Sequence, residues 1–146
     1  MKALYDANVW IALTFPSHSH HKQATEIYEK ASETIPACFT RATQLSYLRL
    51  VTTPALLKAY GADGITNRHA IKMFDTLIQR PQIEFLEEPF EMAALWSQLA
   101  SLKTASPKIW MDAYLAAFAI LSRINLVTLD RDFVRFKKHG LQLTQL

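Results

Sequence analysis

Residues 109–133, which read IWMDAYLAAFAILSRINLVTLDRDF, decide the fold class of this chain. The first part, through about Ser122, is apolar on nearly every side, which predicts a helix buried among other elements. The run LVTL at 126–129 predicts a short strand of the kind that parallel sheets bury on both faces. A buried helix that leads directly into a buried strand is typical of α/β proteins.

The remaining sequence repeats this alternation. Strands are predicted at residues 2–5, 34–39, 82–86 and 141–143, in addition to 126–129. Short helices are predicted at residues 8–13 and 132–136. A second helix is predicted to start at an N-cap, Ser17 or Ser19, and a third runs from the N-cap Thr40 to about Val51. Two further helices are predicted, one between the turn at 62–64 and Pro81 and one that starts at Pro89. The pattern predicts a three-layer α/β/α fold with a mainly parallel central sheet.

The composition is that of one folded domain, which we expect to span residues 1–146, because half of the residues are hydrophobic and 20% are charged. The single cysteine, Cys38, has no partner for an internal disulfide, which favours a reducing compartment. Asp6 interrupts the first apolar run too early for a secretory signal, and the longest apolar run, 109–121, is shorter than the ~20 residues of a membrane span. We therefore expect a cytoplasmic protein.

Three aspartates carry the functional prediction. Asp6 and Asp130 each follow a predicted strand, and neighbouring parallel strands end at the same edge of a sheet. Asp112 is the one acid of an otherwise apolar helix, where a lone buried carboxylate is costly unless a charge compensates it. A hard cation would compensate all three, and oxygen ligands without clustered cysteines select Mg²⁺ or Mn²⁺. This set indicates metal-assisted hydrolysis of a phosphodiester.

Each aspartate also has a simpler explanation. Asp6 and Asp130 could be helix N-caps, and Asp112 could be a first-turn acid that the helix dipole favours. The functional interpretation therefore depends on all three carboxylates meeting at one edge of the sheet.

Three segments of the chain resemble PIN-domain ribonucleases: DANVWI at 6–11, WMDAYLAAFA at 110–119 and LVTLDRDF at 126–133. Their order and spacing are most similar to those of the VapC-type toxins of bacterial toxin–antitoxin pairs, and the resemblance spans essentially the whole chain. It implies a PIN-like fold and a Mg²⁺- or Mn²⁺-dependent endoribonuclease that is usually a homodimer. It also implies that a small cognate antitoxin holds the enzyme inactive.

The resemblance implies a role for each residue that occupies a matching position in these segments. It assigns the catalytic and metal-binding roles to Asp6, Asp112 and Asp130, an accessory acid to Asp132, and hydrogen-bonding roles to Asn8 and Thr128. Gln44 stands where many members have a glutamate, and its amide brings no negative charge. Gln44 is equally well explained as an ordinary helix residue, so the number of bound ions stays open.

Basic and aromatic residues suggest binding surfaces. Arg131 and Arg135 adjoin the third aspartate in sequence and are candidates for contacts with RNA phosphates. Arg49 is either a phosphate ligand or an ordinary surface arginine. Three aromatic residues either line a groove for an apolar helix of the antitoxin or belong to the core, namely Trp10, Phe15 and Tyr47.

Three functions are compatible with these observations. The leading hypothesis is an endoribonuclease toxin that cuts an accessible RNA loop, because the deep groove of an A-form helix hides the base edges. The alternative is a PIN-like module, weakened by Gln44, that serves as an RNA- or protein-binding subunit. A phosphoacceptor domain of the receiver kind ranks last, because neither 34–39 nor 82–86 ends in the aspartate and lysine that it needs.

Overall fold

The computed structural model describes all 146 residues and is centred on a five-stranded sheet in the order β3-β2-β1-β4-β5. Every neighbouring pair of strands is parallel, which confirms the predicted sheet. The strands are β1 (Ala3–Tyr5), β2 (Ala37–Phe39), β3 (Ile83–Phe85), β4 (Asn125–Thr128) and β5 (Gln142–Gln145). The second strand starts later than predicted because residues 32–35 close a turn, in which the Ile35 N–H donates to Ser32 O at 3.2 Å.

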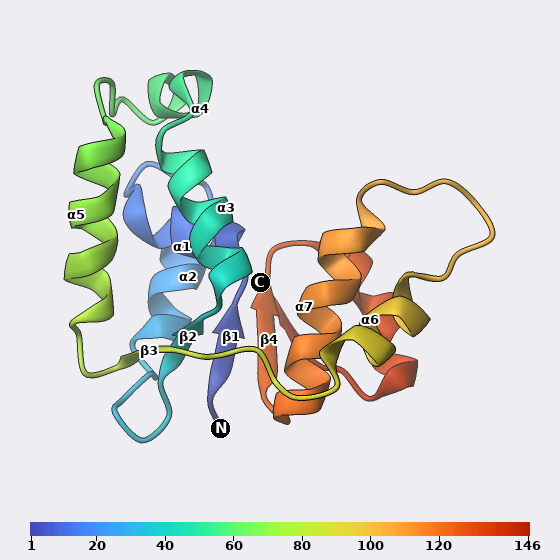
Figure 1. Cartoon of the computed structure of the whole chain (residues 1–146). Helices are drawn as coiled ribbons and strands as arrows, with labels where there is room; N and C mark the ends of the chain where they lie inside the picture. Colours follow the sequence, from blue (N-terminus) through green and yellow to red (C-terminus); the bar gives the residue numbers. More distant parts are fainter.

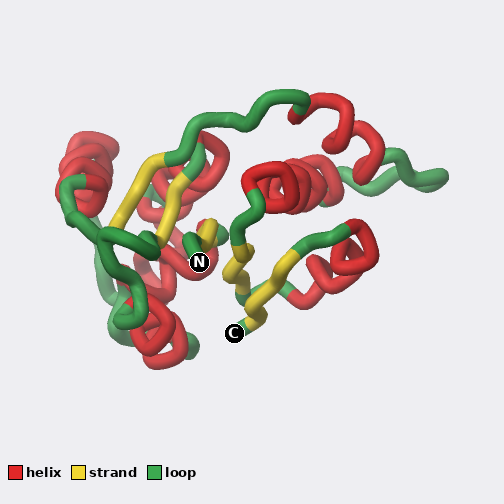
Figure 2. Tube along the Cα trace, turned by 90° about the horizontal axis from the view of Figure 1, so that it is seen from below, coloured by secondary structure: helices red, strands yellow, loops and turns green.

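Helices cover both faces of this sheet, which confirms the three-layer α/β/α fold (Figure 1 and Figure 2). One face carries α1 (Ala7–Thr14), α2 (His21–Tyr28), α3 (Arg41–Val51) and α5 (Asn67–Ile78), with the short α4 (Pro54–Ala59) after α3. The other face carries α6 (Met92–Ala100), α7 (Ile109–Ser122) and the 3₁₀-helix η1 (Arg131–His139). The sequence did not predict α4, because Pro54 ends one helix and also starts the next, where its missing N–H costs nothing.

Successive strand residues enter two separate cores. Leu4 and Leu126 pack with α7 and η1, whereas Tyr5 and Val127 pack with α1 and α3 on the opposite face. Most of α7 is buried as predicted, but Trp110 in its first turn is 58% exposed. No helix in the structure has both the length and the apolar character that a membrane crossing requires.

A side-chain cap explains where α3 begins, whereas α2 begins without one. Thr40 caps α3 as predicted, and its hydroxyl accepts from the Thr43 N–H in a reciprocal capping box. The predicted caps Ser17 and Ser19 are wrong. The chain makes a further turn there, with the His18 N–H donating to Phe15 O at 2.9 Å, so α2 begins after His20 without a side-chain cap.

Candidate functional site

Asp6 and Asp130 meet at the carboxyl edge of the sheet. Asp6 directly follows β1, and Asp130 follows the neighbouring strand β4, in which Val127 is in register with Tyr5. The Asp6 N–H donates to Val127 O at 2.9 Å. The chain leaves β1 toward one face of the sheet and reaches β4 from the other, so this pair flanks the topological switch point at which α/β folds bind ligands.

Both aspartates are helix N-caps and site residues at the same time. One oxygen of each carboxylate caps a helix: Asp6 Oδ1 accepts from the Ala7 N–H at 2.7 Å, and Asp130 Oδ1 accepts from the Asp132 N–H at 2.9 Å. The second oxygen of each carboxylate makes other contacts, with Thr128 in one case and Lys108 in the other. The simpler explanation and the functional one are therefore compatible.

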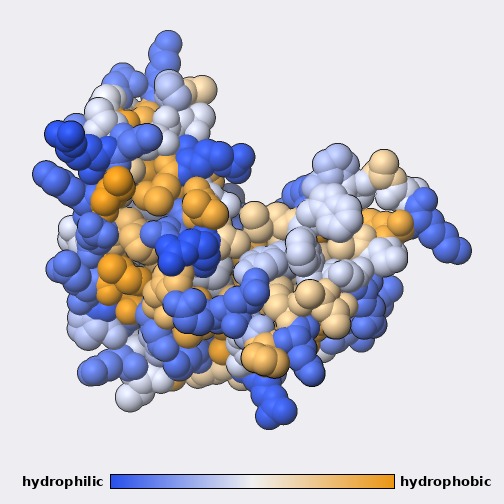
Figure 3. Space-filling model, viewed as in Figure 1, coloured by the Kyte–Doolittle hydropathy of each residue, from blue (hydrophilic) through white to orange (hydrophobic).

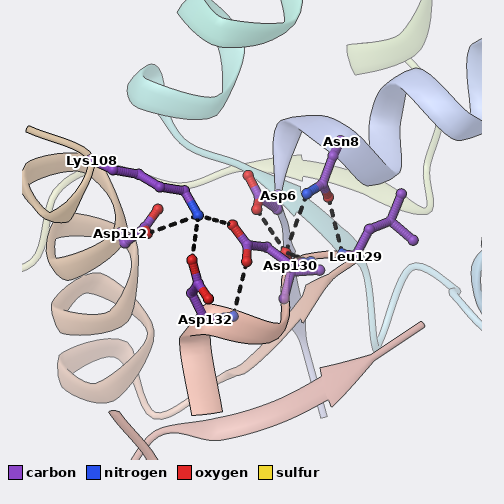
Figure 4. Close-up of polar contacts among 8 residues, drawn as sticks. Asp6, Asn8, Lys108, Asp112, Leu129, Asp130 and Asp132 are labelled. Carbon is purple, nitrogen blue, oxygen red and sulfur yellow. Dashed lines mark hydrogen bonds and ion pairs between the residues drawn. The ribbon is translucent and has the colours of Figure 1, made fainter. Parts of the chain in front are cut away.

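A buried hydroxyl fixes the two carboxylates relative to each other (Figure 4). Thr128 is fully buried, and its Oγ1 donates to Asp6 Oδ2 at 2.7 Å while it accepts from the Asp130 N–H at 3.0 Å. Asn8 supports this arrangement, since its Oδ1 accepts from the Leu129 N–H at 3.2 Å and its Nδ2 lies 3.4 Å from Thr128 Oγ1. Asn8 and Thr128 thus both form hydrogen bonds at the end of β4, next to Asp6 and Asp130.

Three carboxylates form the tightest acidic cluster. One oxygen from each of Asp112, Asp130 and Asp132 lies within 4.8 Å of the other two. Asp112 projects from the first turn of α7 and is only 9% exposed, whereas Asp132 is exposed on η1. Asp6 lies next to this cluster and interacts electrostatically with Asp112 and Asp130. Asp132, which the sequence predicted as an accessory acid, is therefore a member of this cluster.

Lys108 lies in the middle of this cluster, and the sequence did not indicate it (Figure 4). Its Nζ hydrogen-bonds Asp130 Oδ2, donates to Asp132 Oδ2 at 2.8 Å and lies 3.6 Å from Asp112 Oδ2. The available signal was its spacing, because Lys108 precedes Asp112 by one helical turn.

The protonation equilibria of the acids follow from burial and from Lys108. Burial raises the pKa of Asp6, although hydrogen bonds from Thr128 and from the Ala7 N–H act against it. Burial also raises the pKa of Asp112, opposed by Lys108 and reinforced by the neighbouring acids. At Asp130 burial acts in the same direction, but the hydrogen bonds from Lys108 and the Asp132 N–H outweigh it, so its pKa lies below the ordinary value.

The donor set fits a hard divalent cation. All four acids offer oxygen, and no histidine or cysteine joins the cluster. A single ammonium group offsets only one of these negative charges, so the site keeps a net negative charge that a divalent cation would neutralise. The position of the Lys108 ammonium marks the point at which a cation is stabilised.

Four other predicted residues make no side-chain hydrogen bond or ion pair with the acids. Gln44 Oε1 accepts from Arg41, whose guanidinium lies over the Phe85 ring at 4.7 Å from its centroid. Arg49 is exposed in the last turn of α3 and borders a separate cavity of about 270 Å³. Arg131 and Arg135 are exposed on η1 and form no ion pair.

A larger cavity of about 650 Å³ lies on the face of α1, α2, α3 and α5. Trp10, Phe15 and Tyr47 are all buried in the core, and Trp10 and Tyr47 also line this cavity. The indole Nε1 of Trp10 and the hydroxyl of Tyr28, both at the cavity wall, are buried without a hydrogen-bond partner. Lys72 and Arg80 supply positive charge to the same wall.

Comparison with known proteins adds independent information. The family model of the PIN domain matches residues 3–139. The chain is 37% identical to Ribonuclease VapC41 of Mycobacterium tuberculosis over 141 residues, which cover 96% of this chain and 97% of that protein.

Solved structures share the same fold at low sequence identity. VapBC-1 from nontypeable Haemophilus influenzae is 15% identical with a TM-score of 0.69, and the match covers 99% of this chain and 98% of that one. Mycobacterium tuberculosis VapC20, described as a sarcin-ricin loop cleaving toxin, is 14% identical with a TM-score of 0.64 and covers 99% and 100% of the two chains.

Proposed function

The chain belongs to the PIN-domain family, and from this premise we propose that it is a metal-dependent endoribonuclease that acts as the toxin of a type II toxin–antitoxin pair. The observation that carries the proposal is the cluster of Asp112, Asp130 and Asp132 around the Lys108 ammonium at the switch point of the sheet, with Asp6 next to it. The similarity to Ribonuclease VapC41 over nearly the whole of both chains supports the same activity.

In this proposal Asp6, Asp112 and Asp130 hold Mg²⁺ or Mn²⁺, with Asp132 at the exposed side of the site. A divalent ion bound there supplies an activated water and neutralises charge on the phosphodiester. Thr128 and Asn8 position the acids, because their hydrogen bonds fix the Asp6 carboxylate and the backbone at Leu129 and Asp130. The chain thus provides preorganised negative charge for the ion.

RNA is expected to approach from the hollow that the surface forms above the carboxyl ends of the strands, between the α3 and α7 sides (Figure 3). Arg131 and Arg135 extend from η1 beside Asp130 and are proposed to contact phosphates, with Arg49 at a more distant position on α3. The hollow is open, which suits a looped or single-stranded substrate whose bases are accessible.

We assign the antitoxin to the cavity on the α1, α2, α3 and α5 face. Six of its twelve lining residues are hydrophobic, which suits an apolar helix of the partner. Acidic residues would also pair with Lys72 and Arg80. Substituting the exposed Lys72→Glu should weaken binding of the cognate antitoxin in a titration, and unchanged affinity would place the antitoxin elsewhere.

A homodimer is part of the same proposal. Figure 3 shows apolar side chains gathered over α3 and α5, where Leu45 and Ile71 are 61% and 55% exposed. Apolar residues exposed together on one surface favour a contact between copies of the chain. Light scattering should give twice the monomer mass, and Leu45→Glu should reduce it to the monomer mass.

A cleavage assay tests the central activity. End-labelled RNA with structured loops is incubated with the purified protein and Mg²⁺ or Mn²⁺. We expect cleavage that stops on chelation and is lost in Asp6→Asn. The second candidate, a binding module without turnover, is favoured by the uncharged Gln44, and it predicts RNA binding without cleavage at every metal concentration.

A further inference from the structure

Lys108 differs from an ordinary structural ion-pair residue in the number of carboxylates that it contacts and in the exposure of its side chain. Its ammonium touches three carboxylates that come from two different elements, α7 and the segment that begins η1. The side chain is nevertheless 58% exposed, and its backbone forms the start of α7 without any side-chain cap. The long stem can therefore swing into solvent without disturbing the packed core.

The ammonium and a divalent ion compete for one place. The oxygens that would bind the ion are those that now surround Lys108 Nζ, and these oxygens lie within 4.8 Å of one another. Two positive charges at this spacing repel each other, so binding of the divalent ion disfavours the ammonium at the same place. The divalent ion offsets more of the acidic charge than the ammonium does, so it is the preferred occupant once it is available.

We propose that Lys108 is the resident counter-ion of the metal-free site, that it leaves when a divalent ion binds, and that it thereby sets the metal concentration at which the site fills. This inference rests on the proposed function, because it concerns the same metal site. It makes Lys108 a positioning residue that holds three acids together before the ion arrives.

Mn²⁺ titration of variants by calorimetry tests this role without measuring cleavage. Lys108→Met removes the competing charge and should bind Mn²⁺ about tenfold more tightly than the wild type, the change expected for losing one charged hydrogen-bonding partner. Its melting temperature in chelator should fall, because the acids then repel one another without a counter-charge. Lys108→Arg keeps the charge and should stay near the wild type, as should the control Lys103→Met in the exposed loop before α7.

The outcomes separate the two proposals. If the wild type binds Mn²⁺ and Lys108→Met binds it no more tightly, the competing role of Lys108 is wrong while the metal site stands. If neither protein binds Mn²⁺, the metal site itself is wrong and both proposals fall.

Acetylation of lysines, read by mass spectrometry on the wild-type protein, provides a second measurement. Lys108 should become more reactive when Mn²⁺ is added, whereas Lys103 in the same sample should not change. Equal protection of Lys108 with and without Mn²⁺ would overturn the displacement.

Discussion

Thr128 donates a 2.7 Å hydrogen bond to Asp6 Oδ2 across two neighbouring parallel strands, although 122 positions separate the two residues in sequence. The same hydroxyl accepts from the Asp130 N–H, so one buried atom aligns both acids at the end of β1 and β4. This relationship ties the fold to the site, because the register of the sheet brings the hydroxyl opposite the carboxylate.

Removing this hydroxyl should weaken metal binding. Thr128→Val has nearly the same shape but leaves Asp6 with one donor fewer and orphans the Asp130 N–H. We expect Mn²⁺ affinity to fall by about 10- to 100-fold, the range seen when a residue that orients a metal ligand is lost. Calorimetric titration measures this effect. Thr128→Ser keeps the hydroxyl and should bind nearly as well as the wild type, and equal losses in both variants would contradict the assigned role.

Asp112→Asn should abolish cleavage and leave the metal-free protein as stable as before or more stable. Burial raises the pKa of Asp112 in the folded protein, so the folded chain keeps this proton at pH values at which the unfolded chain has lost it. The carboxyl therefore costs nothing below the unfolded pKa, costs increasingly more stability as the pH rises from the unfolded to the folded pKa, and reaches its full cost above the folded pKa. Thermal melting in chelator from pH 4 to 8 should show the melting temperature of the variant rising relative to that of the wild type as the pH rises. A large drop in the melting temperature of the variant would instead make Asp112 a structural residue.

Asp130→Asn should also abolish cleavage, but with the opposite effect on stability. The pKa of Asp130 is lowered in the folded protein, so its charge contributes stability above the unfolded pKa, and this contribution is lost as pH falls through the folded pKa. We expect the variant to lose about 1 kcal/mol of unfolding free energy at pH 7, because it gives up the Lys108 contact. Urea unfolding at pH 7 and pH 3 should show the difference shrinking at low pH, and a constant difference would contradict this origin.

Much of the site was predictable from the sequence because its acids interrupt simple patterns. Asp6 and Asp130 end apolar strands, and Asp112 is the only acid in an apolar helix. Lys108 was not predictable in the same way, because it is one of sixteen basic residues and closes an irregular loop before α7. The approach of Asp132 to Asp112 depends on the 3₁₀ turn at the start of η1, and tertiary contacts of this kind have no local signature.

The contribution of Gln44 depends on Arg41. Gln44→Glu alone should change Mn²⁺ affinity less than about threefold, because the new carboxylate would pair with the Arg41 guanidinium that now binds the amide. In the double variant with Arg41→Ala the carboxylate is no longer neutralised, and a larger gain in affinity is expected. Calorimetry on the two variants and on Arg41→Ala alone gives the comparison. No gain in the double variant would show that position 44 lies outside the field of the site.

Crystals soaked in Mn²⁺ test the proposed cation site among the acids most directly. An anomalous-difference map should contain a peak about 2.0 to 2.2 Å from oxygens of Asp112 and Asp130, with the Lys108 ammonium moved out of the cluster. No peak at these carboxylates in saturating Mn²⁺, with Lys108 still between Asp130 and Asp132, would contradict it.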